Sequence, residues 1–254
     1  PPVYAFNKML VERVAKSGKT QWAAVNHSYE WGQSNLAAFK LHLGNELDGI
    51  EWVDEQWAPI GKLDAGAVVQ SLLASKPDAI YSALWGTDLT NFIREGRARG
   101  LFEGRIVVAD QATRPIFFDQ MGDETLTGIL GIGVPASGIE QKTMSEVAER
   151  YAERSGGSFR YTGSQAYHTM QLIADGIEAA GTTETEALID ALEGLEAETI
   201  FGPVTIRVID HQSTSGIWIG EAGFVDGRPQ LVNWEFKDGN DYFPTDDYIL
   251  NLRQ

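Results

Sequence analysis

The chain has 254 residues, of which 43% are hydrophobic, and it carries a formal net charge of -16 at pH 7. This length and composition allow a sizeable buried core, in one large domain or two modest ones. The acidic balance, without any run of Lys or Arg, argues against nucleic acid or an anionic membrane surface as a partner. The sequence contains no cysteine, which excludes disulfides, thiolate zinc sites and thiol catalysis.

The sequence also bears on the membrane and on the compartment. No apolar run approaches the roughly 18 residues of a spanning helix, so we expect no membrane span in this chain. The opening Pro-Pro-Val-Tyr-Ala-Phe lacks a basic n-region and an apolar h-region, and an exported protein would therefore have lost its signal. The absence of cysteine is compatible with both the cytosol and an oxidising compartment.

Residues 21–41 form the first predicted β-turn-α unit. A short apolar run is typical of a buried strand, and the polar, Gly-containing turn after it carries Tyr29 and Trp31. A helix with apolar residues at helical spacing follows. Ligands in open α/β sheets bind outside the carboxyl ends of the strands, so we expect this turn to be functional.

Two more units of this kind follow. Their predicted strands are residues 79–84 and 105–109, and Trp85 and Asp110 come directly after them. Strands that alternate with helices predict crossover connections, a parallel sheet and helices on both of its faces. The other elements predicted in this half are a helix at 7–17, a strand at 50–58, a helix capped by Asp64 and a helix that starts at Pro115.

The second half has a different pattern. A Gly-rich apolar run at 126–135 predicts a strand that leaves the sheet for another lobe. A helix at 164–180 carries the predicted apolar stripe Tyr167, Met170, Ile173, Ala174 and Ile177. Further predicted elements are helices at 140–154 and 185–195, strands at 204–208, 217–220 and 230–236, and a hairpin turn at Asp226-Gly227.

Five stretches together carry a family resemblance. They are Ala-Ala-Val-Asn-His-Ser-Tyr-Glu-Trp-Gly, Lys-Pro-Asp-Ala-Ile-Tyr-Ser-Ala-Leu-Trp-Gly-Thr-Asp-Leu, Gly-Arg-Ala-Arg-Gly-Leu, Gly-Ser-Gln-Ala-Tyr-His-Thr and Val-Ile-Asp-His-Gln. Through their order and spacing, the chain resembles the type I periplasmic solute-binding proteins of branched-chain amino-acid ABC transporters over nearly its whole length. Family members begin with a further lobe-one segment, so the resemblance implies that roughly the opening third is missing here.

The resemblance implies an α/β fold with parallel sheets flanked by helices in two hinged lobes, the first of them incomplete. Residues 1–130 would form lobe two, residues 131–216 the remainder of lobe one, and residues 217–254 the strands that return to lobe two. The implied function is periplasmic: a small ligand, either an amino acid or a small aromatic or aliphatic carboxylate, is bound between the lobes and delivered to an ABC transporter permease. The implied protein is not an enzyme and uses neither a metal nor a cofactor.

The resemblance also assigns candidate ligand-binding residues. Trp31 and Trp85 fall where family members have aromatic side chains that line the cleft, although packing under a loop would also explain them. Tyr167 matches a tyrosine that closes over the ligand, and core packing is its alternative. The family carboxylate that receives a ligand ammonium falls at Asp110 by charge or at Gln111 by alignment. Gln111 in that role would indicate a ligand without an α-ammonium, and Asp110 could instead be a helix N-cap.

Other functions lack their sequence signatures. The four histidines have no metal-ligand spacing, and no nucleophile elbow or phosphate-binding loop is present. The acidic stretch from Glu184 to Glu198 is typical of a solvated helix face. Two alternatives stay open: the ligand-sensing ectodomain of a receptor, and a flavodoxin-like α/β enzyme in which Asp110 would be the acid or base.

Overall fold

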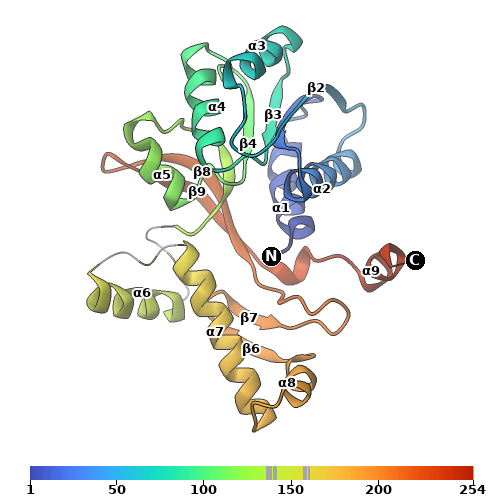
Figure 1. Ribbon diagram of the computed structural model, residues 1–254, viewed down its shortest axis with the longest axis vertical. Coiled ribbons are helices and arrows are strands. Elements are labelled where there is room, and N and C mark those ends of the chain that lie inside the picture. The colour runs from blue at the N-terminus through green and yellow to red at the C-terminus, as the bar shows by residue number, and fades with distance from the viewer. Residues whose placement is uncertain (136–138, 140–141, 157–158, 160, 254) are drawn as a thin grey trace. The chain divides into compact units, whose positions relative to one another are not determined.

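A computed structural model of the chain describes residues 1–135, 139, 142–156, 159 and 161–253 (Figure 1). The chain divides into two compact units, which we call unit 1 and unit 2 and describe separately. Unit 1 consists of Pro1–Ala5, Val134–Ile217 and Phe236–Gln254, and unit 2 of Phe6–Gly133 and Trp218–Glu235. Among the described helices, none has the length and apolar character that crossing a bilayer requires.

Unit 2 is built on a seven-stranded sheet with the strand order β2-β1-β3-β4-β5-β8-β9. The first five strands in this order pair in parallel, and β8 runs antiparallel to β5. The predicted α/β class with a mostly parallel sheet is therefore confirmed. The strands are β1 (Gln21–His27), β2 (Glu51–Ala58), β3 (Ala79–Ser82), β4 (Ile106–Ala109), β5 (Leu130–Gly133), β8 (Ile217–Val225) and β9 (Arg228–Lys237).

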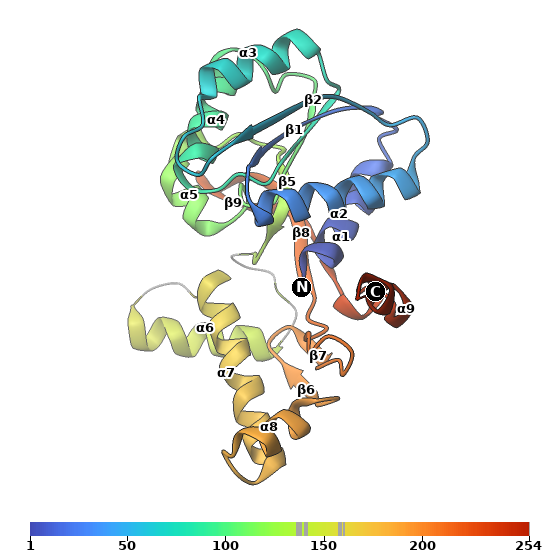
Figure 2. The same ribbon diagram turned by 45° about the vertical axis from the view of Figure 1, so that its right-hand side comes forward.

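Helices cover both faces of this sheet (Figure 2). Side chains alternate between the faces along a strand, and in β1 the buried Trp22 contacts Phe39 of α2, with 5.1 Å between ring centroids. Ala23 and Val25, at the alternate positions of β1, point to the opposite face, where they join a core shared with α3, α4 and α5. The helices are α1 (Val3–Ala15), α2 (Glu30–Glu46), α3 (Ala65–Ser75), α4 (Gly86–Ala98) and α5 (Pro115–Met121), and a short 3-10 helix, η1, spans Gly122–Glu124.

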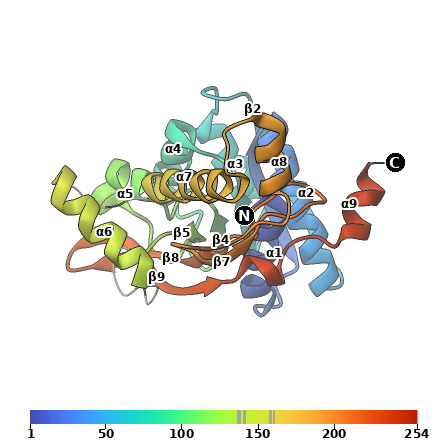
Figure 3. The same cartoon turned by 90° about the horizontal axis from the view of Figure 1, so that it is seen from below.

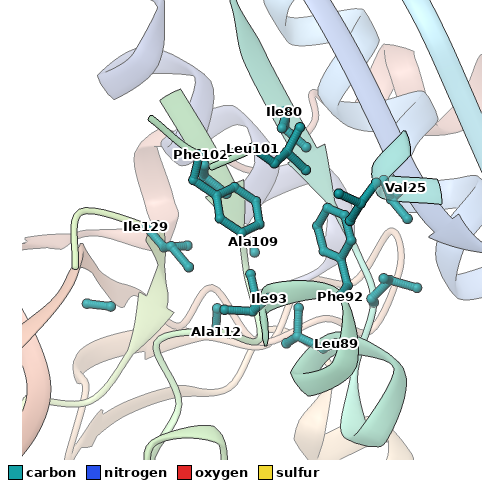
Figure 4. Packing of buried hydrophobic residues seen from close by; sticks show 14 of the residues in the cluster. Val25, Ile80, Leu89, Phe92, Ile93, Leu101, Phe102, Ala109, Ala112 and Ile129 are labelled. Atoms are coloured by element: carbon teal, nitrogen blue, oxygen red, sulfur yellow. The ribbon is translucent and has the colours of Figure 1, made fainter. Parts of the chain in front are cut away.

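The core on the α3–α4 face is a large cluster of buried hydrophobic side chains (Figure 4). Phe92 of α4 lies beside Val25 of the sheet, Ile93 lies near Ala109 and Ala112, and Phe102 meets Phe92 edge-to-face at 5.6 Å. Fully burying side chains of this size contributes about 1.5–3 kcal/mol each to the stability of the fold. This core holds the strand ends of unit 2 in fixed positions.

Several local predictions are confirmed. Asp64 caps α3 by accepting a hydrogen bond from the backbone N–H of Ala67 at 3.0 Å, and Pro115 occupies the first turn of α5. Asp226 and Gly227 connect β8 to β9 with φ of 50° and 73°, as a tight hairpin turn requires. The first helix begins at Val3, earlier than predicted, and ends before Gly18.

The Gly-rich run at 126–135 was predicted to be a strand that leaves the sheet for another lobe. The run does contain a strand, β5, after which the chain passes from unit 2 to unit 1 at Val134. Strand β5 lies inside the sheet, between β4 and β8. A Cβ on Gly131 would lie 2.3 Å from the Thr113 hydroxyl and 2.7 Å from the Ala109 carbonyl oxygen. Glycine is therefore needed because the turn after β4 packs directly on β5, where Thr113 donates a hydrogen bond to the Ile132 carbonyl at 2.9 Å.

Unit 1 has a two-stranded antiparallel sheet and four helices among its described residues, apart from the start of α1. Helices α7 and α8 lie side by side (Figure 3). Leu172, Val204 and Ile206 form a small core to which Leu192 and Leu195 add partly buried side chains. The elements are α6 (Lys142–Ser155), α7 (Tyr161–Ala180), α8 (Thr185–Leu192), β6 (Glu196–Thr199), β7 (Gly202–Thr205), a 3-10 helix η2 (Gly239–Asp241) and α9 (Asp246–Leu252).

Two predictions for unit 1 are wrong, and Glu140, where a helix was expected to start, lies outside the described residues. Residues 196–199 form a strand, so Glu196 and Glu198 lie on one exposed face of β6 and do not line a helix face. The apolar stripe predicted on α7 is largely exposed, with Met170 63% accessible. The buried side chains of α7 are instead Ser164, His168 and Leu172, because that face is the one turned toward the small core.

Phe39→Ala tests the packing of the α2 face. Phe39 is fully buried and stacks on Tyr81 with 4.2 Å between ring centroids, so we expect a loss of about 3–5 kcal/mol in the free energy of unfolding. Urea unfolding would measure it. Leu41→Ala, on the exposed side of the same helix, is the matched control and should cost less than about 0.5 kcal/mol. Equal effects of the two changes would contradict this packing.

Candidate functional site

The candidate site lies where β1, β3 and β4 end. The chain leaves β1 to form β2 on one side and returns to form β3 on the other, so the direction of the strand order reverses between β1 and β3. Helices α2 and α4 leave from these two neighbouring strand ends. A crevice forms at such a reversal in parallel α/β sheets, and ligands bind there, outside the carboxyl ends of the strands.

Two aromatic residues occupy the N-cap positions at this reversal. Tyr29 is the N-cap of α2 and Trp85 the N-cap of α4, and neither side chain makes a capping hydrogen bond. Ser, Thr, Asp or Asn usually fills this position, and replacing such a cap typically costs about 1 kcal/mol. Aromatic side chains at both N-caps therefore do not serve helix stability.

Tyr29 and Trp85 are joined to each other and to a buried pair beneath them. The indole Nε1 of Trp85 donates a hydrogen bond of 3.0 Å to the Tyr29 hydroxyl. The ring of His27 contacts the Trp85 ring edge-to-face, with 5.4 Å between centroids. His27 Nε2 lies 2.9 Å from Asp88 Oδ2, and the backbone N–H of Gly61 donates to the same oxygen at 2.7 Å.

This cluster was missed from the sequence except for Trp85 and the position of Tyr29. His27 is the last residue of β1 and Asp88 lies in the first turn of α4, 61 residues along the chain. Had β1 and β3 been predicted as neighbouring strands, His27 and Asp88 would have been expected to lie close together. The contact of His27 with Asp88 does not test the prediction that the histidines form no metal site.

Trp31 lies in the first turn of α2 and not in the turn before it, where it was expected. It is half-buried, and its ring lies 6.2 Å from the ring of Phe6. Its Nε1 is buried without a hydrogen-bond partner among the described residues. A Cβ on the adjacent Gly32 would lie 2.1 Å from the His27 carbonyl oxygen, so this helix start requires glycine. The unsatisfied indole N–H is compatible with ligand contact.

Asp110 and Gln111 follow β4 and act together. The Gln111 Nε2 donates a hydrogen bond to Asp110 Oδ2, and Arg114 Nη2 lies 3.9 Å from the same oxygen. The other carboxylate oxygen, Oδ1, is buried without a partner among the described residues. The N-cap of α5 is Arg114, so the alternative of Asp110 as a helix N-cap is wrong.

The pKa of Asp110 is unusual. Burial raises this pKa from 3.8 to about 6, although the positive charge of Arg114 and the hydrogen bond from Gln111 act in the opposite direction. A carboxyl group with such a pKa changes its charge near neutral pH, and groups of this kind concentrate at functional sites.

Tyr167 belongs to unit 1, whereas the other four predicted ligand-binding residues belong to unit 2. It lies on α7 and is 37% exposed, so it is not a core residue. Its ring meets Phe159 edge-to-face at 6.4 Å.

The described cavities lie elsewhere. One of about 230 Å³ in unit 2, lined by Arg97, Phe102, Arg105 and Thr127 among others, lies at the amino ends of β4 and β5. Among the described residues, no group of three His, Asp or Glu side chains could hold a metal ion.

Asp110→Asn tests the cost of keeping this carboxyl buried. The folded-state pKa exceeds the ordinary value, so the stability contributed by Asp110 is present below about pH 4 and is lost as pH rises toward 6. A rise of about two pKa units corresponds to about 3 kcal/mol, so the variant should gain up to that amount at pH 7.5 and little at pH 4.

Urea unfolding of both proteins at the two pH values would measure the gain. Asp123→Asn, at an exposed carboxyl nearby in the chain, is the control and should show no such pH dependence. A variant that is no more stable than the original protein at pH 7.5 would contradict the raised pKa.

Three solved structures show the same fold. A solute-binding protein of an ABC transporter from Rhodopseudomonas palustris BisB5, in complex with 3,4-dihydroxybenzoic acid, is 22% identical with a TM-score of 0.79, and the match covers 93% of this chain and 65% of that one. An amino-acid ABC transporter substrate-binding protein from Pseudomonas fluorescens Pf-5 is 18% identical with a TM-score of 0.82, over 97% of this chain and 66% of that one.

The third is the leucine-, isoleucine-, valine-, threonine- and alanine-binding protein from Brucella ovis in its closed conformation. It is 19% identical with a TM-score of 0.79, over 94% of this chain and 63% of that one. The chain thus spans slightly less than two thirds of the length of all three.

Sequence comparison with curated proteins gives no match. The sequence model of one family, described as "Periplasmic binding protein", matches residues 4–228, which is most of the chain. Because this match extends over most of the chain and the α/β fold agrees with it, the chain belongs to the periplasmic binding protein family.

Proposed function

We propose that this chain binds a small ligand with a carboxylate group in the periplasm and delivers it to the permease of an ABC importer. The ligand would be an amino acid, including the branched-chain type, or a small aromatic or aliphatic acid. Membership of the periplasmic binding protein family supports this function. Structures with the same fold include ABC transporter proteins whose names give an amino acid, benzoate or 4-hydroxybenzoate.

The observation that carries the proposal is the set of side chains at neighbouring strand ends. Tyr29 and Trp85, 36% and 39% exposed, follow β1 and β3, and the half-buried Gln111 follows β4. Aromatic rings at such positions bury apolar ligand surface, and well-oriented ring contacts add about 0.5–1.5 kcal/mol beyond burial. Trp31 would add its unsatisfied indole N–H to the same wall.

The first turns of α2 and α4 suit the ligand's carboxylate. Their N-cap side chains make no capping bond, so the backbone N–H groups at these helix starts can be offered to an anion. By contrast, α3 satisfies one of its own N–H groups through Asp64.

Gln111 and Asp110 have different parts in this proposal. The hydrogen bond from Gln111 Nε2 to the fully buried Asp110 directs the amide nitrogen inward, which leaves Gln111 Oε1 as an acceptor for a ligand N–H or O–H group. Asp110 then acts behind Gln111 through its charge. The contribution of Tyr167 from unit 1, and closure of two lobes over the ligand, stay predictions.

Calorimetric titration with leucine, valine, benzoate and 4-hydroxybenzoate tests the function. We expect one of them to bind, and Trp85→Ala and Gln111→Ala each to weaken that binding by about ten-fold, equivalent to about 1.4 kcal/mol. Trp234→Ala, on the far edge strand β9 of the same sheet, is the control and should leave affinity unchanged. Turnover of a bound compound, or unchanged affinity in both site variants, would contradict the proposal.

The pH dependence of binding separates the two ligand classes. A ligand with an ammonium group gains from ionised Asp110, so its affinity should rise about ten-fold between pH 5 and 7.5, with a midpoint near the pKa of about 6. A ligand that carries only a carboxylate should bind no more tightly over the same range. Asp110→Asn should abolish the dependence, and a slope that persists in this variant would show that another group causes it.

A further inference from the structure

We propose that His27 and Asp88 are positioning residues that hold Tyr29 and Trp85 as one rigid aromatic wall. We further infer that this wall makes the site prefer ligands with a planar ring over branched aliphatic ligands of similar size. The inference deepens the proposed function and rests on it.

The first step is the connection between three strand ends. Asp88 Oδ2 accepts hydrogen bonds from the backbone of Gly61, in the loop after β2, at 2.7 Å, and it lies 2.9 Å from the Nε2 of His27, at the end of β1. Asp88 itself lies in α4, the helix that follows β3. One carboxylate oxygen therefore ties together the carboxyl ends of β2, β1 and β3, which are adjacent in the sheet.

The His27–Asp88 pair is buried. The side chains of His27 and Asp88 are 0% and 7% exposed, so losing Asp88 would leave the Nε2 of His27 buried and unsatisfied, whereas Asp88 would keep its hydrogen bond from Gly61 if His27 were lost. The Nδ1 of His27 is buried without a partner among the described residues, which favours the tautomer with hydrogen on Nε2, donated to Asp88. These constraints fix the orientation of the His27 ring.

The buried His27 ring also contacts the two exposed aromatic rings, those of Tyr29 and Trp85. The centroid of the His27 ring lies 5.4 Å from that of Trp85 and 6.2 Å from that of Tyr29, so this buried ring packs against both. The Trp85 Nε1–H donates to the Tyr29 hydroxyl at 3.0 Å, which links the rings across the top. Each ring is thus held by two contacts while more than a third of it stays exposed.

The functional consequence follows from preorganisation. Side chains that are already fixed lose little conformational freedom when a ligand binds, and a fixed aromatic surface accepts another flat ring in offset-stacked or edge-to-face geometry. A branched aliphatic ligand has no flat surface to match. A mobile Tyr29 and Trp85 would adapt to both shapes and would discriminate less.

Benzoate and isovalerate are suitable probes, since both present one carboxylate and differ in a ring against a branched chain. Their dissociation constants would be measured for the original protein, Tyr29→Phe and Asp88→Asn. We expect the ratio of isovalerate to benzoate dissociation constants to fall at least five-fold in both variants. Tyr29→Phe removes only the hydroxyl acceptor, so it remains informative even if Asp88→Asn does not fold.

A second readout follows the wall itself. The indole N–H resonance of Trp85, assigned by its loss in Trp85→Phe, should move upfield in Tyr29→Phe because its acceptor is gone, and should shift or broaden in Asp88→Asn. Tyr151→Phe and Asp78→Asn are the matched controls at exposed positions in α6 and before β3, and both should leave the ratio and the resonance unchanged.

The outcomes separate the inference from the function it rests on. Binding of benzoate with an unaltered ratio in both variants would overturn the ring preference while leaving the proposed function in place. An unaltered Trp85 resonance in both variants would overturn the positioning role. Binding of neither probe by the original protein would overturn the ring preference, whereas the proposed function would stand if leucine or valine binds in the calorimetric titration. The resonance would still decide the positioning role.

Discussion

Parallel pairing of β1 with strands on both sides is the constraint on which the rest of unit 2 depends. Parallel neighbours cannot be joined by a tight turn, so each connection must cross the sheet through a helix. The five parallel strands then end at one edge of the sheet, and the helices that follow β1 and β3 begin beside each other. Tyr29 and Trp85, 56 residues apart in the chain, form a hydrogen bond for this reason.

The alternation of side chains along β1 makes the two faces of the sheet different. In β1 the large Trp22 alternates with the small Ala23, so the α2 face takes an aromatic cluster while the opposite face takes the aliphatic core around α4. Both layers are well filled in unit 2. Unit 1 has only a small core among its described residues, and less burial supports its helices there.

Features with a local cause were predictable from the sequence. The alternation of strands and helices, the cap at Asp64 and the turn at Asp226 depend on neighbouring residues and were predicted correctly. The buried face of α7 depends on what packs against it, and apolar spacing alone indicated the wrong side. The acidic stretch from Glu184 to Glu198 was predicted to be a solvated helix face, but Glu196 and Glu198 lie in the strand β6.

The candidate site shows the same limit. Positions after predicted strands identified Trp85 and Asp110, because strand ends can be located from sequence. The contacts that define the site join distant residues: Asp88 with His27, and Trp85 with Tyr29. The order of strands in the sheet decides such contacts, and β2 had to be placed outside β1 before they could be recognised. The ligand-binding roles of all five candidate residues stay predictions: Trp31, Trp85, Asp110, Gln111 and Tyr167.

The path of the chain leaves β5 without its partner strand β8 for part of the time that the protein is being synthesised. Its pairing partner β8 lies beyond the whole 134–217 segment, which belongs to unit 1. As the chain emerges from the ribosome, the sheet from β1 to β5 can assemble first, and β5 then presents an open hydrogen-bonding edge until β8 has been synthesised. Open edges recruit other strands. Strand β5 is only four residues long and contains two glycines, so it is a short and weak template for mispairing during that interval.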